Sequence, residues 1–217
     1  IWYSLISSSN NFVNLNGANI AIVLLITLWA TRLGSFLFMR IHKDGEDKRF
    51  RTIKPSATQF FMTWTLQGLW VSLCSMCALT AISSDTGVVM NVLFYIGLGL
   101  FLYGFITEVI ADKQKTAFRS IPENRDKFIT TGLWAKSRHP NFFGEIVLWT
   151  GIAVMSFSSL AGLQYLTLIS PVFTYLLLVY VSGVRMLEAR ADKKWGDNEE
   201  YIRYKTDTPV LIINYKL

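Results

Sequence analysis

The feature that most constrains the fold of this chain is the alternation of long apolar stretches with polar, basic segments. Each apolar stretch is about as long as the roughly 20 residues that a helix needs to cross a hydrocarbon core of about 30 Å. We therefore expect an all-α polytopic membrane protein, a bundle of at least five transmembrane helices. Residues 1–17 read as a loop or the end of a further span, without the features of a signal peptide. The apolar stretches lie at about residues 18–39, 57–82, 88–110, 140–158 and 163–184.

Lysine and arginine are concentrated in three segments that follow the first, third and fifth apolar stretches. Residues 40–55 carry six of them, residues 111–139 seven and residues 185–217 seven, out of 21 in the chain. With five crossings these segments share one side of the membrane, and the positive-inside rule assigns that side to the cytoplasm or its matrix equivalent. The formal net charge of +6 is then a topology signal. We expect membrane lipids as neighbours and no nucleic-acid partner.

The fourth apolar stretch begins with a motif that predicts an anion site. Pro140 suits the first position of a helix, because its φ is already helical and its missing N–H would have no partner there. The amides of residues 141–143 would then be unpaired donors at the positive end of the helix dipole, beside Arg138. Glu145 lies one turn beyond Asn141, and a carboxylate inside an apolar segment indicates a functional site.

Two other segments carry polar side chains to the same predicted side. Glu108, Asp112, Thr116 and Arg119 recur at helical spacing, which places them on one stripe as the third stretch ends. A solvated helical extension explains the same pattern. Arg185 and Glu188 share a face after the fifth stretch, although both side chains could simply reach the interface. For Arg138 the alternative is a topological charge, and for His139 a helix cap.

Cys74 and Cys77 form a C-x-x-C pair inside the second apolar stretch. Since there is no second pair and no flanking histidine, we interpret them as small buried hydrophobic residues and expect no metal site.

Three parts of the sequence resemble the steroid 5-alpha-reductase-like membrane family, over roughly residues 25–213. The first is Gly132-Leu-Trp-Ala-Lys-Ser-Arg-His-Pro-Asn-Phe-Phe-Gly-Glu145. The second is the tail, with Gly183-Val-Arg-Met-Leu-Glu188, Trp195-Gly-Asp197 and Tyr201-Ile-Arg-Tyr204. The third is Gly45-Glu-Asp-Lys-Arg-Phe50, typical of a bacterial-type branch. The Arg-His-Pro-Asn core is also similar to sterol reductases and, more distantly, to isoprenylcysteine carboxyl methyltransferases.

The resemblance implies a bundle of about seven helices with NADPH in a cytosol-facing pocket. The chain would be a single transmembrane domain, with residues 1–110 on the substrate side and residues 111–217 as the cofactor-binding half. Asp112 and Arg119 would contact the adenosine-phosphate part, Arg185 the pyrophosphate, and Asn141 and Glu145 the nicotinamide end. Tyr201 and Tyr204 would close the pocket. The cofactor-binding residues expected are Asp112, Arg119, Ser137, Arg138, His139, Asn141, Glu145, Arg185, Glu188, Tyr201 and Tyr204.

The sequence departs from that family at one position of the second apolar stretch. Steroid reductases carry Gln-Glu-Leu there, and the acid hydrogen-bonds the substrate's keto oxygen, whereas this chain has Gln67-Gly68-Leu69. Conjugate reduction needs a donor to that oxygen as enolate charge develops. Gln67 or Tyr103 could supply it, which makes these two and Glu145 the candidate catalytic residues. An interhelical hydrogen bond for Gln67 and core packing for Tyr103 explain both residues equally well.

Three functions remain open from the sequence. The first is an NADPH-dependent reductase of an activated C=C bond in a lipophilic, steroid- or isoprenoid-like substrate. The second is an S-adenosylmethionine (SAM)-dependent membrane methyltransferase of isoprenylcysteine type. The third is a catalytically silent subunit of a larger membrane complex.

Overall fold

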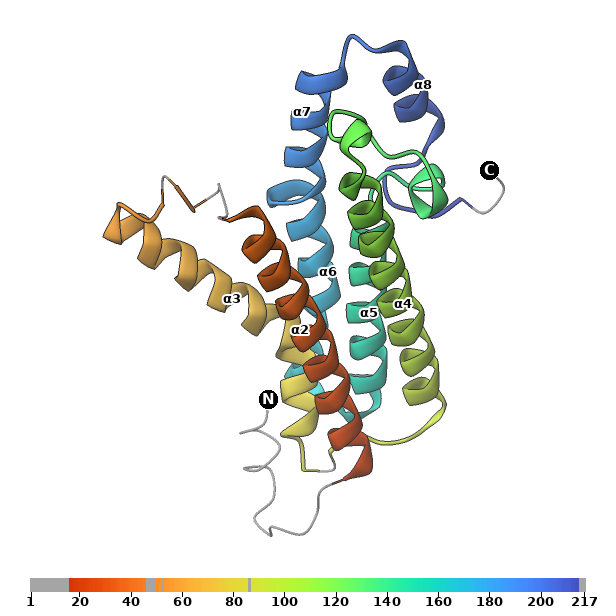
Figure 1. The fold of residues 1–217 in the computed structure, drawn as a ribbon. Coiled ribbons are helices and arrows are strands. Elements are labelled where there is room, and N and C mark those ends of the chain that lie inside the picture. Colours follow the sequence, from red (N-terminus) through yellow and green to blue (C-terminus); the bar gives the residue numbers. More distant parts are fainter. Residues whose placement is uncertain (1–15, 46–49, 52, 86, 215–217) are drawn as a thin grey trace. The chain divides into compact units, whose positions relative to one another are not determined.

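The computed structural model describes residues 16–45, 50–51, 53–85 and 87–214. Most of the predicted N-terminal loop and residues 46–49 of the Gly45–Phe50 motif lie outside this part of the chain. The described residues form helices and connecting loops, with no strand among them (Figure 1). The α-helices of this part of the chain are α2 (Gly17–Asp44), α3 (Ala57–Ile82), α4 (Val92–Ser120), α5 (Pro140–Ser156), α6 (Ile169–Leu176), α7 (Val184–Trp195) and α8 (Glu199–Asp207).

Among the described residues, five helical segments are long and apolar enough to cross a membrane, which confirms the predicted fold class of a polytopic all-α membrane protein. Large hydrophobic side chains are exposed along them, including Phe38, Phe61 and Val92. In water such a surface would be costly, whereas lipid tails solvate it. α3 has the predicted bounds, but α4 starts four residues later than predicted and continues into the polar segment as far as Ser120.

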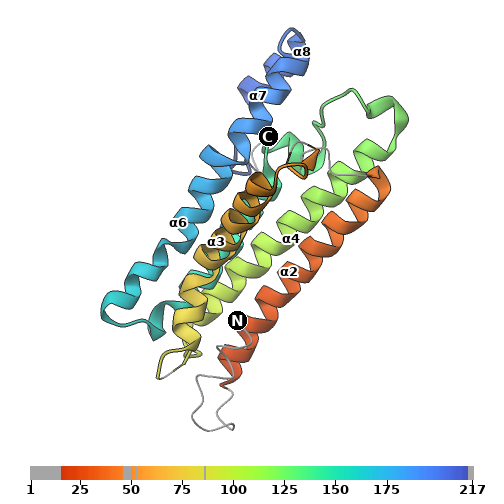
Figure 2. The same cartoon turned by 90° about the vertical axis from the view of Figure 1, so that its left-hand side faces the viewer.

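The fifth apolar stretch is less regular than the single span that the sequence predicts. A 3₁₀ segment (Gly162–Leu168) leads into α6, a π-helical turn (Leu177–Val181) follows, and the chain breaks at Gly183 before α7. α7 continues the line of α6 in the second view (Figure 2). A Cβ on Gly183 would overlap the Leu178 carbonyl and lie 2.9 Å from the Phe142 ring, so only glycine fits this break.

The described residues divide into two compact units. The first contains those up to Asn91 together with Ser156–Ser170, and the second contains Val92–Met155 together with those from Pro171 onward. In the first unit, the side chain of Asn19 fixes the turn that follows α3. Asn19 is buried, and its Oδ1 accepts a hydrogen bond of 2.8 Å from the amide of Val88. Asn16 caps α2 by accepting from the Ala18 amide at 2.9 Å.

The second unit is built on close contact between α4 and α5, which run side by side (Figure 1). Two glycine pairs, Gly97 with Gly151 and Gly104 with Gly144, allow the backbones to approach. A Cβ on any of the four would overlap a backbone atom of the facing helix. Small residues at helix interfaces are how membrane helices gain packing contacts where the hydrophobic effect supplies none.

Candidate functional site

The charged end of the second unit begins with a 3₁₀ turn, η3 (Gly132–Ala135), that docks on the end of α4. Gly132 has a φ of +63°, in the left-handed region that favours glycine. The Leu133 amide donates to Gln114 Oε1 at 2.9 Å, and the Trp134 indole N–H donates to the Ala111 carbonyl at 3.0 Å. These bonds determine where the chain enters α5.

A C-terminal segment, the tail strap (residues 209–214), pairs with the residues just before α5. The amide of Arg138 donates to the Pro209 carbonyl at 2.9 Å, and the amide of His139 donates to the Val210 carbonyl at 3.1 Å. The fully buried Ser137 donates from Oγ to the Leu211 carbonyl at 2.8 Å. The backbone of the Ser-Arg-His motif is therefore held by the far end of the chain.

The carboxylate of Glu188, in α7, binds the side chains of the two residues that precede α5. Its Oε2 lies 3.0 Å from Arg138 Nη1, and its Oε1 lies 2.8 Å from His139 Nε2. The His139 ring also stacks on Phe142, with centroids 5.7 Å apart and planes at 7°. The sequence predicts Arg138, His139 and Glu188 at one site, and the structure brings them together in a single ion-pair network.

α8 extends this network through its basic and phenolic side chains. Lys205 Nζ lies 2.6 Å from Asp192 Oδ1 and 3.8 Å from Glu188 Oε2. Tyr201 donates to Asp192 Oδ1 at 3.0 Å, and Tyr204 donates to the Trp134 carbonyl at 2.7 Å. Burial raises the pKa of both phenols above the usual value, with Asp192 adding to the effect at Tyr201. Both tyrosines therefore stay protonated and act as donors at neutral pH.

Three carboxylates are buried in α4 and α5 of the same unit. The exposed fractions of Glu108, Asp112 and Glu145 are 3%, 8% and 8%. The backbone of Glu108 packs against Gly144 of α5, since a Cβ on Gly144 would come within 2.8 Å of the Glu108 amide nitrogen. Removing carboxylates from water is costly, which makes this group a candidate functional centre.

The predicted helix-start donors need one correction. The amide of Phe143 is not an unpaired donor, because it donates to the His139 carbonyl at 3.1 Å. Within the described chain, the amides of Asn141 and Phe142 donate to no protein acceptor. The reason is that the first turn of α5 already closes on His139, one residue before the proline.

The remaining predicted residues are distributed over both units. Arg119 and Arg185 are exposed, and neither makes an ion pair within the described residues. Tyr103 is half exposed and packs edge-on against Phe143, with centroids 6.3 Å apart. Gln67 is exposed on α3, in the first unit. The catalytic and cofactor-binding roles of these residues stay predictions.

An aromatic cluster in the second unit was not predicted. Phe128 lies at its centre, 5.7 Å from Trp195, 5.3 Å from Tyr201 and 5.7 Å from Tyr204, measured between ring centroids. The partners of Phe128 lie about 70 residues further along the chain, so no local pattern in the sequence identifies them.

The five apolar helical segments indicate a multi-pass membrane protein. Its candidate site, the ion-pair network and the buried carboxylates, lies in the second unit. The chain matches the family described as "Protein of unknown function (DUF1295)" over residues 3–208, and it belongs to that family.

Among curated proteins, the chain is 30% identical over 116 residues to the "Probable O-methyltransferase ustE" of Ustilaginoidea virens. The match covers 46% of this chain and 41% of that protein, so the chain spans less than half the length of this relative. No solved structure matches.

Proposed function

We propose that this protein is an integral membrane enzyme that uses NADPH to reduce an activated C=C bond in a lipophilic substrate. The observation that carries the proposal is that one unit contains both buried carboxylates and exposed arginines without ion pairs. Arg119 and Arg185 are exposed without ion pairs in the described chain, and the buried Nε of Arg138 has no hydrogen-bond partner there. Phosphate groups suit such arginines, because the planar guanidinium binds oxyanions bidentately.

The residues of this unit divide into binding and polarising roles. Arg119 and Arg185 bind phosphates, while Asn141 and Glu145 orient the reacting end of the cofactor. NADPH supplies the hydride when bound. The Tyr103 hydroxyl donates to the substrate carbonyl oxygen as negative charge develops on it. Substrate reaches the site from the bilayer, which suits a lipophilic molecule.

O-Methyl transfer from SAM is the second candidate. The observation that favours it is the name of the relative from Ustilaginoidea virens, which shares 30% identity over 116 residues. SAM carries a carboxylate but no phosphate. Under this alternative the start of α5 holds that carboxylate, and neutralising Arg119 and Arg185 has little effect on binding.

Thermal unfolding of the detergent-purified protein with NADPH, NADP, NADH and SAM distinguishes the two. A ligand present at about 100 times its dissociation constant stabilises the folded state by about 2.7 kcal/mol. The proposal expects a shift with NADPH that Arg119→Ala and Arg185→Ala reduce. Arg190→Ala, which removes another exposed charge of α7, is the matched control. A shift with SAM alone overturns the reductase in favour of the methyltransferase, and no shift with any ligand favours a silent subunit.

A further inference from the structure

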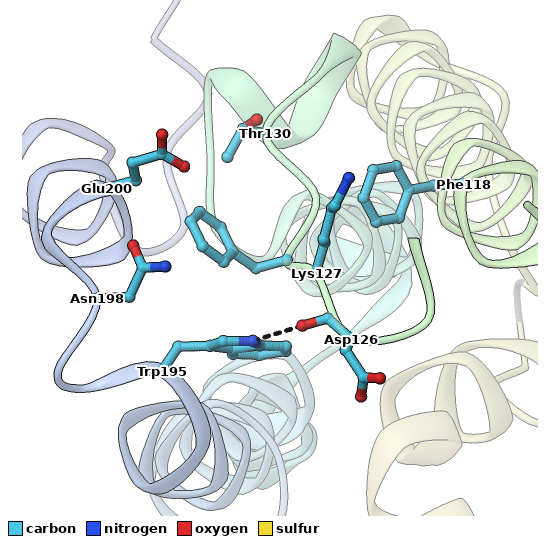
Figure 3. Close-up of a pocket in the computed structure, with 8 residues that line it drawn as sticks. Phe118, Asp126, Lys127, Thr130, Trp195, Asn198 and Glu200 are labelled. Atoms are coloured by element: carbon cyan, nitrogen blue, oxygen red, sulfur yellow. Dashed lines mark hydrogen bonds between the residues drawn. The ribbon is translucent and has the colours of Figure 1, made fainter. Parts of the chain in front are cut away.

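A hollow of about 420 Å³ opens at the charged end of the second unit (Figure 3). Its walls come from the end of α4, the segment before η3, the end of α7 and the start of α8. None of the three buried carboxylates described above lines it. It is lined by Phe118, Asp126, Lys127, Phe128, Thr130, Trp195, Asn198 and Glu200.

The walls of the hollow are aromatic and held in place. Phe118, Phe128 and Trp195 are half-buried, although most of their sequence neighbours are exposed. The Trp195 indole N–H donates to the Asp126 carbonyl at 2.8 Å, the bond drawn in Figure 3. Asp126 in turn pairs with Lys194 at 2.8 Å. A site with fixed aromatic walls favours a flat, aromatic ligand, because stacking needs no further ordering of the protein.

The rim of the hollow carries hydrogen-bond donors and acceptors of the kind that recognise the polar edge of a nucleobase. Thr130, Asn198 and Glu200 are exposed, and Glu200 makes no ion pair within the described chain. A carboxylate accepts hydrogen bonds only, so it selects an amino group over a carbonyl. Adenine presents an exocyclic amino group on its edge, and hypoxanthine presents a carbonyl at the same position.

The hollow is connected to the candidate site by a short chain of contacts. The Phe128 ring packs on Tyr204, whose hydroxyl donates to the Trp134 carbonyl, and the Trp134 indole donates to the Ala111 carbonyl next to Asp112. Lys127, which lines the hollow, is exposed. A ligand with a base in the hollow therefore has a cation of the lining available for a phosphate.

We propose that this hollow binds the adenine ring of the nucleotide cofactor, with Glu200 accepting a hydrogen bond from the exocyclic amino group. The inference rests on the proposed function insofar as the protein binds a nucleotide cofactor. It does not depend on which one, because NADPH and SAM both contain adenosine.

The base preference is tested by titrating the full chain in detergent with NADPH, SAM, AMP and IMP. AMP has an exocyclic amino group at the position proposed to contact Glu200, and IMP has a carbonyl group there. We expect AMP to bind about three- to tenfold more tightly than IMP, the range for one exposed hydrogen bond. Glu200→Gln should remove most of this preference, because its amide can donate as well as accept. The neighbouring Glu199, which does not line the hollow, provides the control Glu199→Gln.

The location is tested by filling the hollow. Thr130→Trp places a large side chain at the rim, and we expect it to weaken binding of AMP and of the active cofactor roughly tenfold or more, as loss of base stacking does. Thr206→Trp adds the same bulk to the exposed part of α8 and should leave binding unchanged. Since Thr130 is exposed, this substitution does not disturb the core.

The outcomes separate the two proposals. If NADPH or SAM binds and neither Thr130→Trp nor Glu200→Gln changes the affinity for it or for AMP, the adenine site is overturned and the proposed function stands. If SAM but not NADPH binds, and Thr130→Trp weakens its binding, the adenine site stands and the proposed reductase function falls. If AMP binds but neither cofactor does, both proposals fall. If no adenosine compound binds, both fall. Binding of phosphocholine that Thr130→Trp blocks, without binding of AMP, also overturns the adenine site in favour of a lipid headgroup.

Discussion

Oε1 of Glu188 lies 2.8 Å from Nε2 of His139, and the other oxygen of the same carboxylate lies 3.0 Å from Arg138. Because a carboxylate only accepts hydrogen bonds, it holds the proton of His139 on Nε2. Glu188 thus links α7 to the entry of α5 and orients both members of the Arg-His pair. Its contacts are those of a positioning residue, which acts through its neighbours.

Replacing Glu188 by glutamine should destabilise the second unit. The amide NH₂ would face Arg138 or His139, both of which are donors, and would leave a partly buried guanidinium without its counterion. We expect a loss of about 1–3 kcal/mol, allowing for the 19% exposure of the Glu188 side chain. The measurement is thermal unfolding in detergent, with Glu199→Gln as the exposed control. Equal melting temperatures for the wild type and Glu188→Gln would contradict the positioning role.

The glycine contacts between α4 and α5 predict that two alanine substitutions in one helix differ in effect. Gly104→Ala would place a methyl group against the Gly144 carbonyl, and overpacking of this kind costs about 1–3 kcal/mol. Gly99→Ala has no neighbour within 4 Å and should be neutral or slightly stabilising, since alanine favours helix by up to about 1 kcal/mol over glycine. Melting temperatures of the two variants provide the comparison. A loss at Gly99 as large as that at Gly104 would show that helix–helix contact is not the cause.

The sequence predicts those parts of this fold that follow from local chemistry. α3 begins at Ala57 and ends at Ile82 as predicted, because Ser56 caps a continuous apolar run and a polar turn follows it. α5 begins at Pro140 for the same kind of local reason.

Long-range pairing is what the sequence could not supply. The tail strap reaches Arg138 and His139 across about 70 residues, and no local pattern identifies carbonyl groups as partners. Phe128 meets Trp195 and Tyr201 in the same way. Gly183 is required both by a local contact, with the Leu178 carbonyl, and by a distant one, with the ring of Phe142. Resemblance to a protein family can assign such residues to one site, but which of them contact each other is known only from the folded structure.

Tyr204 should make the stability of the second unit dependent on alkaline pH. Burial raises the pKa of its phenol, so the folded state keeps a proton that the unfolded chain releases above about pH 10. The stabilisation is complete below that pH and is lost as pH rises further.

Tyr204→Phe should lower stability by about 1 kcal/mol at neutral pH, through loss of the bond to Trp134, and should weaken the alkaline dependence. Melting curves from pH 7 to 11 measure both effects. The exposed Tyr95 provides the control Tyr95→Phe, and an unchanged alkaline slope in Tyr204→Phe would contradict the assignment.

Ionic strength should affect binding of the two candidate cofactors differently. NADPH carries a pyrophosphate and a ribose phosphate, and the arginines proposed to meet them, Arg119 and Arg185, are exposed. Exposed charges are screened within a Debye length of about 10 Å at 0.1 M salt and about 3 Å at 1 M salt. We therefore expect the affinity for NADPH to fall several-fold between these concentrations, and to fall less in the Arg119→Ala, Arg185→Ala double variant. SAM carries no phosphate, so its binding should change little. Titration at the two salt concentrations tests this, and salt-independent NADPH binding would mean that the exposed arginines do not hold its phosphates.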